Sequence, residues 1–356
     1  MTDDVQEHGT ALRDDLSIEP FRGSATEWDA LLEGFDGGSV CHVYGWREVM
    51  EGALEHETFW WVARDRQGDV KGILPLVLVR SRLFGAYLVS MPFLNYGGPV
   101  GTPAAQVRLA EHAANQATTL RVDLLELRNR ARLCALGLVV NERKLTVVKS
   151  LPETTKELWE KGIKAKVRSQ IRRPIKEGME IRFGSDLVDA FYDVFSTTMR
   201  DLGTPVLPRR FFEGIRTSLP DASLFAVVEY EGVPVAAACG FMWRDEFEVT
   251  WAGASRAHSR LAPNMLLYWG LMEESVRRGL RVFNFGRCSP DSGTHKFKRQ
   301  WGSEDQGLPW LQWSAGGVRS MPNPDSPKYR LATYAWRRMP VRVANVLGPP
   351  LSRLLP

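Results

Sequence analysis

Short apolar runs alternate with helix-like periods along most of this chain, and the same order of elements occurs twice. In the first half, the aromatic and β-branched runs 59–63 and 73–79 flank a glycine-bearing turn, which predicts a β-hairpin. In the second half, the runs 224–228 and 233–241 flank a similar turn. Each hairpin is followed by a third strand, a helix and a fourth strand. These six elements are predicted at residues 87–91, 104–120 and 124–127, and at 246–251, 263–279 and 281–285.

The repeated pattern predicts two α/β domains. Residues 1–16 are polar, acidic and aperiodic, which predicts a disordered lead. A joint near Pro152 divides the rest into an N-terminal domain at 17–150 and a C-terminal domain at 151–315. The remaining residues, 316–356, begin with a proline-rich stretch and have no acidic residue from Lys328 onward. They predict a basic tail that is part amphipathic helix and part proline-broken chain.

Composition narrows the class of protein. The chain of 356 residues has 44% hydrophobic and 25% charged residues, which is typical of a folded soluble protein. The four cysteines have no metal-ligand spacing, so neither a zinc site nor a disulfide scaffold is expected, and Cys134 and Cys239 are predicted to be buried in apolar runs. No apolar run reaches the roughly 20 residues that span a bilayer. With an acidic N-terminus that does not fit a signal peptide, these features predict a cytoplasmic protein.

A basic segment opens the second domain. Between residues 151 and 182, nine Lys and Arg residues stand against five Glu. A helix is predicted there, with Lys164, Arg168 and Arg172 on one face, an end or a bend at Pro174, and a stop at Gly178. This cationic face fits either a solvated surface or a phosphate contact.

Most motifs of common enzymes are absent. There is no GxSxG, no Walker loop, no HExxH and no GxGxxG after a strand, so hydrolase, NTPase and dehydrogenase chemistry have no local support. The glycine-rich stretch 97–101 follows Asn95 and Tyr96. It fits a tight turn at a strand end, and it equally fits the lining of an acceptor cleft.

The most informative stretch is 283–302. An apolar run ends at Gly286 and Arg287, a polar loop with two turn signals follows, and a cluster of lysines and aromatic residues comes next. The pattern FGR-x-S-x-x-D-S-G-T-x-x-FK-x-x-WG resembles the last conserved block of the FemAB-like acyltransferases. KAKVRSQIRRPIKEG at 164–178 is similar to the K-x-R-x-x-I-R-x-x-x-K-x-G pattern of that family, and the YGGP stretch and Tyr44-Gly45-Trp46 resemble its first-domain elements.

This resemblance implies two tandem GNAT-like domains, each a mixed sheet flanked by helices, and hairpin, strand, helix, strand is the order of a GNAT core. It also implies roles for particular residues. Lys298 would stabilise an oxyanion, Arg287 would hold a phosphate or carboxylate, and Asp291 would accept the amine proton, although Asp291 also fits a turn cap and His295 is a second candidate base. The residues implied in substrate binding are Arg168, Arg172, Lys176, Arg287, Tyr44, Trp46, Asn95 and Tyr96.

The resemblance further implies an acyl or aminoacyl transfer to an amine of a cell-envelope precursor, nucleotide- or lipid-linked and related to peptidoglycan or exopolysaccharide. Members of the family found beside exosortase/PEP-CTERM sorting genes are similar. The donor would be aminoacyl-tRNA, with acyl-CoA as the alternative, and no tightly bound cofactor is expected. An acyl-CoA enzyme of this fold normally has a glycine-rich loop for the pyrophosphate, whereas no glycine lies between Gly253 and Gly270 here.

Two other expectations stay open. A non-catalytic binding module in envelope assembly would share the same fold. The basic tail would either pack on the body with its arginines in water or rest on the anionic inner face of the plasma membrane.

Overall fold

The computed structural model describes residues 16–316 and 327–355, and the chain divides into two compact units. Unit 1 comprises Met1–Glu142, Leu308–Pro322 and Arg353–Pro356, and unit 2 comprises Arg143–Gly307 and Asn323–Ser352. This division differs from the predicted domain ranges because two long strands each cross the boundary. The predicted boundary at residue 150 is the end of one of them. The predicted disordered lead lies outside the described residues, apart from Leu16.

Unit 1 holds the first copy of the predicted pattern. Its helical elements are α2 (Ala25–Glu33), η1 (Val40–His42), α3 (Gly45–Glu48), η2 (Val49–Ala53) and α4 (Pro103–Thr119). Its strands are β1 (Ser17–Pro20), β2 (Glu57–Arg64), β3 (Val70–Ser81), β4 (Gly85–Val89), β5 (Val100–Gly101) and β6 (Leu124–Leu127), together with parts of β7 (Val139–Ser150) and β13 (Glu304–Ser314).

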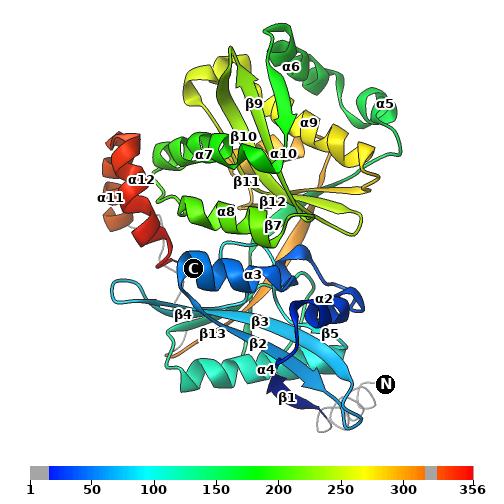
Figure 1. Cartoon of the computed structure of the whole chain (residues 1–356), viewed down its shortest axis with the longest axis vertical. Helices are drawn as coiled ribbons and strands as arrows, with labels where there is room; N and C mark the ends of the chain where they lie inside the picture. The colour runs from blue at the N-terminus through cyan, green and yellow to red at the C-terminus, as the bar shows by residue number, and fades with distance from the viewer. Residues whose placement is uncertain (1–15, 317–326, 356) are drawn as a thin grey trace. The chain divides into compact units, whose positions relative to one another are not determined.

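The sheet of unit 1 has the order β1-β2-β3-β4-β6-β13, with β5 beside β3. The strands β4 and β6 pair in parallel, and they are joined through α4. Alternating apolar positions of the strands face α4, whose Ala105 and Leu109 are fully buried against Leu74 and Leu125. On the other face α2 and α3 cover the sheet (Figure 1), and the Trp28 and Trp60 rings lie 4.7 Å apart.

Unit 2 holds the second copy and has more helices. Its helical elements are α5 (Thr155–Glu157), η3 (Leu158–Gly162), α6 (Ala165–Lys176), η4 (Ser185–Leu187), α7 (Val188–Leu202), α8 (Arg209–Ser218), η5 (Arg256–Leu261), α9 (Pro263–Arg277), α10 (Gly293–Arg299), α11 (Pro327–Arg338) and α12 (Val341–Ser352). Its strands, besides part of β7, are β8 (Glu180–Phe183), β9 (Ser223–Tyr230), β10 (Val233–Trp243), β11 (Glu246–Ala254) and β12 (Val282–Cys288).

The sheet of unit 2 has the order β7-β12-β11-β10-β9-β8, and β11 with β12 is its parallel pair. One face packs on α9 and α6, so that Ile171 and Leu267 belong to one apolar cluster with Val249. The opposite face packs on α7 and α8, where the Phe191 ring lies 5.4 Å from that of Phe225. The mixed sheet, the helices on both faces and the repeated hairpin-strand-helix-strand order are as predicted.

Some local predictions are confirmed and others are wrong. The basic helix runs through Pro174 to Lys176, because Pro174 lies in the last turn and costs only one hydrogen bond there. Gly178, with φ +80°, ends the helix as predicted: its amide donates to Ile175 and the next amide donates to Pro174. Cys239 is buried as predicted, but Cys134 is exposed.

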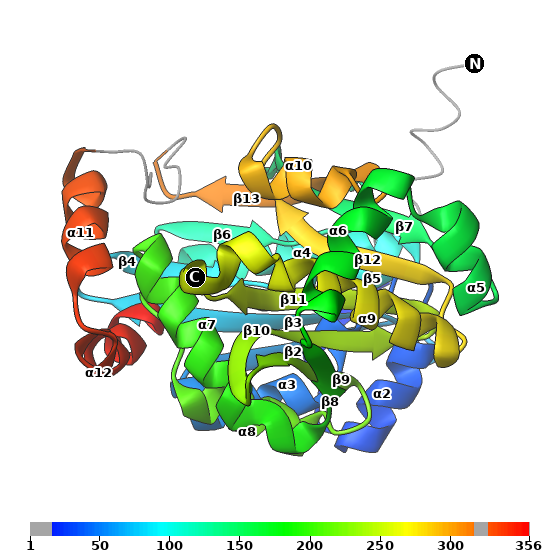
Figure 2. The same cartoon turned by 90° about the horizontal axis from the view of Figure 1, so that it is seen from above.

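The predicted basic tail forms two helices, α11 and α12, and both pack against α7 (Figure 2). Pro349 and Pro350 lie in the last turn of α12, so the prolines do not interrupt the helix before its end. Among the described residues, no helix is both long enough and apolar enough to cross a membrane.

Candidate functional site

The parallel strands of unit 2 pair over a short distance and then separate. Their pairing ends at Glu248 opposite Asn284. Directly beyond this pair both strands bulge. On β11, Thr250 is the extra residue facing Cys239 and Gly240 of β10. Ligands of open α/β sheets bind where neighbouring strands diverge at their carboxyl ends, so this is the place where unit 2 can admit a substrate.

The second bulge, on β12, turns two carbonyls toward a buried cation. The register with β7 shifts between Asn284 and Arg287, and Gly286 has φ +74°, a conformation that favours glycine. The ammonium of Lys298, on α10, donates to the carbonyl of Gly286 at 2.6 Å and to that of Arg287 at 3.0 Å. Lys298 is only 4% exposed, and burial lowers its pKa to about 8. An ammonium has three donors, so these contacts leave one N–H for another acceptor.

A buried carboxylate on β11 acts on the same ammonium. Glu248 is 4% exposed, accepts a hydrogen bond from Thr250 at 3.1 Å, and its charge favours the protonated form of Lys298. Sequence reasoning missed Glu248, because an acid in an alternating strand reads as a solvent-facing residue. Its position directly before the bulge is a tertiary feature that leaves no mark in the sequence.

The side chain of Asn284 on β12 links its own strand to β7 and β11. Its side-chain oxygen accepts from Thr146 of β7 and from the Gly286 amide, and its amide donates to Glu246 at 2.8 Å. The bulge that presents the Gly286 carbonyl is therefore held by two buried hydrogen bonds to the Asn284 side-chain oxygen.

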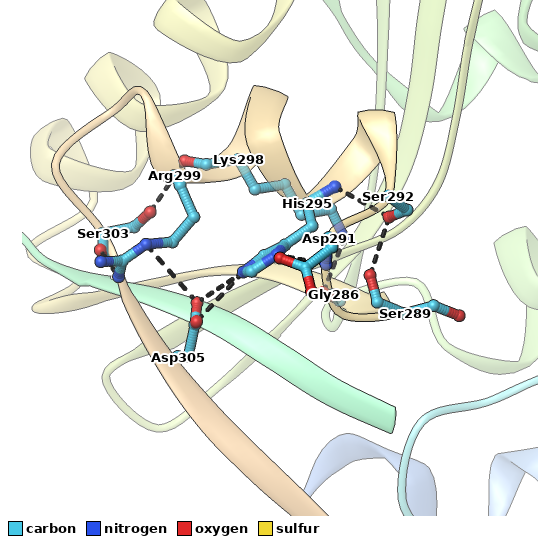
Figure 3. Close-up of polar contacts among 9 residues, drawn as sticks. All are labelled: Gly286, Ser289, Asp291, Ser292, His295, Lys298, Arg299, Ser303 and Asp305. Atoms are coloured by element: carbon cyan, nitrogen blue, oxygen red, sulfur yellow. Dashed lines mark hydrogen bonds and ion pairs between the residues drawn. The ribbon is translucent and has the colours of Figure 1, made fainter. Parts of the chain in front are cut away.

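The loop before α10 is organised by His295 (Figure 3). Its Nδ1 accepts the backbone N–H of Asp291 at 3.0 Å, and its Nε2 lies 3.0 Å from both carboxylate oxygens of Asp305. Since Nδ1 accepts, the proton of the neutral ring is on Nε2 and is donated to Asp305. One ring nitrogen thus contacts the loop and the other contacts Asp305 of β13, which fits a positioning role, and His295 as a base stays a prediction.

Asp291 and Arg287 occupy different surroundings. Asp291 is exposed and has φ +59°, a turn conformation that Asp tolerates, so its geometry fits the turn alternative. Arg287 is half-buried near the end of β12, and its own carbonyl accepts a hydrogen bond from Lys298. Its predicted role in holding an anion stays a prediction.

The cations of α6 also separate into two groups. Arg168 does not stand free on the helix face, because its guanidinium donates to the carbonyls of Trp159, Glu160 and Ile163 at the end of η3. Arg172 is exposed and lies over the Trp159 ring at 5.3 Å. Lys176 is exposed in the last turn.

The segment after α10 and the segment before α6 lie close together. Lys149, buried on β7, donates to the carbonyl of Gly302 at 3.4 Å, and a Cβ on Gly302 would lie 3.9 Å from the carbonyl oxygen of Gly162. The chain directly before α6 therefore lies beside the chain directly after α10. Arg172, two turns further along α6, lies over Trp159, whereas the buried Lys298 contacts carbonyls of β12, so a common guest for both stays a prediction.

The predicted binding residues of unit 1 are largely interior. Trp46 is fully buried and its indole donates to the Val40 carbonyl at 2.8 Å. Tyr96 and Asn95 are 1% and 4% exposed. Tyr44 is half-buried, and its ring lies 4.9 Å from Trp60. These positions fit a core and a locked turn better than a substrate-lining surface.

Unit 1 closes the equivalent place between its own parallel strands. Pairing of β4 and β6 ends at Val89 opposite Glu126. Arg128, 2% exposed, donates to Glu126 at 2.9 Å and to the carbonyls of Met91 and Leu94 at 3.2 and 2.8 Å. A buried ion pair and its hydrogen bonds thus fill the position where a substrate would enter.

Two other features of the described residues bear on function. An open hollow of about 730 Å³ lies in unit 1 beside β1 and α2, and its walls include Arg22, Glu27 and Arg64. It belongs to the unit that does not contain Lys298, so we do not assign the chemistry to it. Among residues 16–316 and 327–355, no three His, Cys, Asp or Glu side chains are grouped to hold a metal ion.

Comparison with known proteins agrees with this geometry. Residues 163–299 match the sequence family described as acetyltransferase (GNAT) domain, and this segment contains β11, β12 and Lys298. No curated protein sequence matches the chain. The match identifies residues 163–299 as a GNAT-type acyltransferase domain.

Solved structures resemble the whole chain at low identity. FemX is 14% identical with a TM-score of 0.64, over 88% of this chain and 100% of that chain. The C-terminal domain of an Agrobacterium fabrum protein described as a lysylphosphatidylglycerol synthetase is 13% identical with a TM-score of 0.55, over 87% and 93%. A tandem GNAT protein from the clavulanic acid biosynthesis pathway is 14% identical with a TM-score of 0.54, over 86% and 100%. The tandem GNAT-like fold is therefore shown by three structures.

Proposed function

We propose that this protein transfers an aminoacyl group from aminoacyl-tRNA to an amino group of a cell-envelope precursor, at the point in unit 2 where β11 and β12 separate. The observation that carries the proposal is the buried ammonium of Lys298. It is held by two neutral carbonyls and has one N–H that these carbonyls do not use. Such a cation suits a reaction in which negative charge develops on a carbonyl oxygen.

The reaction forms one bond and breaks another. The amine nitrogen attacks the ester carbonyl carbon, a C–N bond forms, and the carbonyl oxygen becomes negative while Lys298 donates to it. The C–O bond to the ribose then breaks, and the ribose oxygen takes a proton as the amine loses one. Glu248 is the buried carboxylate next to Lys298, and we assign it, ahead of the exposed Asp291, to accept the amine proton.

The choice of aminoacyl-tRNA over acyl-CoA rests on the segment before α9. Here the chain forms η5, then Ala262 with φ +57° and Pro263 at the first turn, without any glycine. Side chains on this loop hinder the close backbone approach that a pyrophosphate needs at a helix N-terminus. The exposed cations of α6, Arg172 and Lys176, offer contacts for a phosphate backbone instead.

The fold likenesses support the same class of reaction. A lysylphosphatidylglycerol synthetase is, by its name, a protein that attaches lysine to a lipid, and FemX carries the name of the family that the sequence motifs resemble. The acceptor would be nucleotide- or lipid-linked and related to peptidoglycan or exopolysaccharide. The reaction would take place in the cytoplasm, where aminoacyl-tRNA is made.

An acyl-CoA donor is the second candidate, and the GNAT domain match favours it. One experiment compares both donors. The purified chain is incubated with tRNA charged with radiolabelled amino acids, or with a panel of labelled acyl-CoA thioesters, and with envelope precursors that carry a free amine. We expect transfer from charged tRNA and none from acyl-CoA.

Two controls make the result specific. Lys298→Ala should abolish the transfer, whereas Lys296→Ala, which changes an exposed lysine of the same helix, should not. Transfer from acyl-CoA alone would replace the proposed donor. Transfer that survives in Lys298→Ala would refute the proposed site, and a folded protein inactive with every donor would favour the binding-module alternative.

A further inference from the structure

The last two helices of unit 2 are fixed to its body through small residues. On α12 the buried residues are Ala344, Gly348 and Ser352, and a Cβ on Gly348 would lie 3.0 Å from the Val206 amide, which follows α7 in the chain. The Asn345 amide donates to Ser196 of α7 at 3.2 Å, and the Arg200 guanidinium donates to the Met339 carbonyl at 2.9 Å. These contacts hold the helix pair against α7 in one orientation (Figure 2).

Both helices of the pair expose large apolar side chains. On α12, Val343, Val346 and Leu347 are 42%, 71% and 45% exposed, and the spacing of three and four residues puts them on one face. On α11, Leu331 and Tyr334 are 70% and 56% exposed, three residues apart. Of the eleven large apolar side chains exposed in the described part of the chain, five lie on these two helices. A surface of this kind is usually covered by a partner.

The charge of the segment says what that partner is. Residues 327–356 contain six Lys and Arg and no Asp or Glu. Arg338 and Arg342 are both exposed, and the Arg338 guanidinium lies 3.5 Å over the exposed Tyr334 ring. Apolar side chains beside cations in a segment without acidic residues match an anionic bilayer, which offers acyl chains and negative headgroups together. A second copy of the same surface would bring like charges together, and a nucleic acid would leave the apolar stripe exposed.

We propose that α11 and α12 form an interfacial docking surface that binds the headgroup region of an anionic phospholipid bilayer. The apolar stripe of Val343, Val346 and Leu347 enters the acyl boundary, and Arg338 and Arg342 contact the lipid phosphates. This surface is separate from Lys298, so bilayer binding does not depend on the proposed chemistry.

Vesicle co-sedimentation tests the docking surface. The full chain is mixed with vesicles of phosphatidylglycerol and phosphatidylcholine, or of phosphatidylcholine alone, at physiological ionic strength. We expect binding only to the anionic vesicles, and weaker binding as salt rises. Arg338→Ala/Arg342→Ala should lower the affinity about 30-fold, since each cation near the surface contributes about 1 kcal/mol. Val346→Ser/Leu347→Ser should also lower it, although it leaves the charge unchanged.

A matched control separates this surface from general basicity. Arg173→Ala/Arg216→Ala removes the same charge from exposed positions on α6 and α8 and should leave vesicle binding unchanged. Circular dichroism and thermal melting check that each variant is folded. Equal losses in the control, equal binding to uncharged vesicles, no binding to anionic vesicles, or a dimer that α12 variants dissociate would each overturn the proposal.

Discussion

In unit 1 the parallel strands β4 and β6 separate after Val89 and Glu126, and in unit 2 the parallel strands β11 and β12 separate after Glu248 and Asn284. Each unit places a buried cation near this point. In unit 1 it is Arg128, two residues along the strand from the acid that neutralises it. In unit 2 it is Lys298, which arrives from a separate helix and meets backbone carbonyls.

The difference explains why one unit is a candidate for chemistry and the other for support. The guanidinium of Arg128 is engaged by a carboxylate, by two carbonyls and by the face of Trp310 at 4.8 Å. Arg128 fills the space between β4 and β6 beyond their last paired residues, and its charge is compensated by Glu126. The ammonium of Lys298 has lost water and gained only neutral acceptors in direct contact, so it still attracts a developing negative charge. We therefore call the strand gap of unit 1 sealed, because its cation is paired with a carboxylate, and that of unit 2 open, because Lys298 contacts only backbone carbonyls.

The largest expected effect is on the sealed gap. Arg128→Ala leaves Glu126 buried without its cation, and the free energy of unfolding should fall by about 3–5 kcal/mol. Denaturant unfolding measures the loss. Arg132→Ala, which removes one partner of an exposed ion pair with Glu142, is the control and should change stability by less than about 1 kcal/mol. A small loss in Arg128→Ala would show that water enters the gap and that it is not sealed.

The next effect is on the open gap. Lys298→Ala should lower kcat for transfer at least 100-fold, the scale of one lost oxyanion donor, or about 3 kcal/mol. Lys298→Met keeps the volume of the side chain and should show the same loss with less effect on thermal stability. Lys296→Ala is the control on the same helix. A variant of Lys298 that melts normally and turns over normally would remove this residue from the mechanism.

The sequence predicted the strands that border both gaps but not the buried charged residues that lie in them. Apolar alternation revealed the hairpins and the strands that follow them, because burial of one strand face imposes a period of two. The FK pattern pointed to Lys298. Glu248 and the pair of Glu126 and Arg128 were invisible, since a charged residue in a strand is read as exposed unless its distant partner is known. The fixed position of His295 also depends on Asp305, which lies ten residues away on the next strand.

Residue type misled the predictions where a side chain is both polar and structural. Trp46 and Tyr96 were predicted to bind substrate, but their rings are buried. Arg168 was predicted to face a ligand, but it caps the end of a helix. Family motifs preserve packing and capping residues as well as substrate contacts, and only coordinates separate the two.

The pH dependence of transfer sharpens the assignment of Lys298. Burial lowers its pKa from 10.5 to about 8. If the ammonium is the active form, kcat should fall about tenfold per pH unit above 8 as the proton is lost. The ratio of wild type to Lys298→Arg cancels the titration of the acceptor amine, so this ratio is the quantity to plot. A ratio that rises above pH 8 would instead make neutral Lys298 a base.

The same shift predicts the sign of a stability change. Because the pKa of Lys298 is lower in the folded protein, the unfolded chain binds more protons between pH 8 and 10.5. The contribution of Lys298 to the free energy of unfolding should therefore increase with pH through that window, and it is least favourable below pH 8. Lys298→Met should remove this increase, which denaturant unfolding at several pH values would detect.

The smallest expected effect concerns the cations of α6 in unit 2. Arg172→Ala should weaken binding of tRNA only a few-fold near physiological salt, and it should reduce the slope of log K against log salt by about one, because one phosphate contact is lost. Fluorescence anisotropy with labelled tRNA measures both quantities. Arg168 is unsuitable for this test, since its guanidinium caps η3.

Arg173→Ala provides the comparison for that measurement, because Arg173 is exposed on the same helix and points about 100° around the axis from Arg172. If both variants lose the same affinity, α6 attracts tRNA by its overall charge and no particular phosphate is held. If neither changes the slope, the donor does not contact α6. In that case the cation that matters for the donor must lie nearer to Lys298, and Arg287 at the end of β12 becomes the residue to replace next.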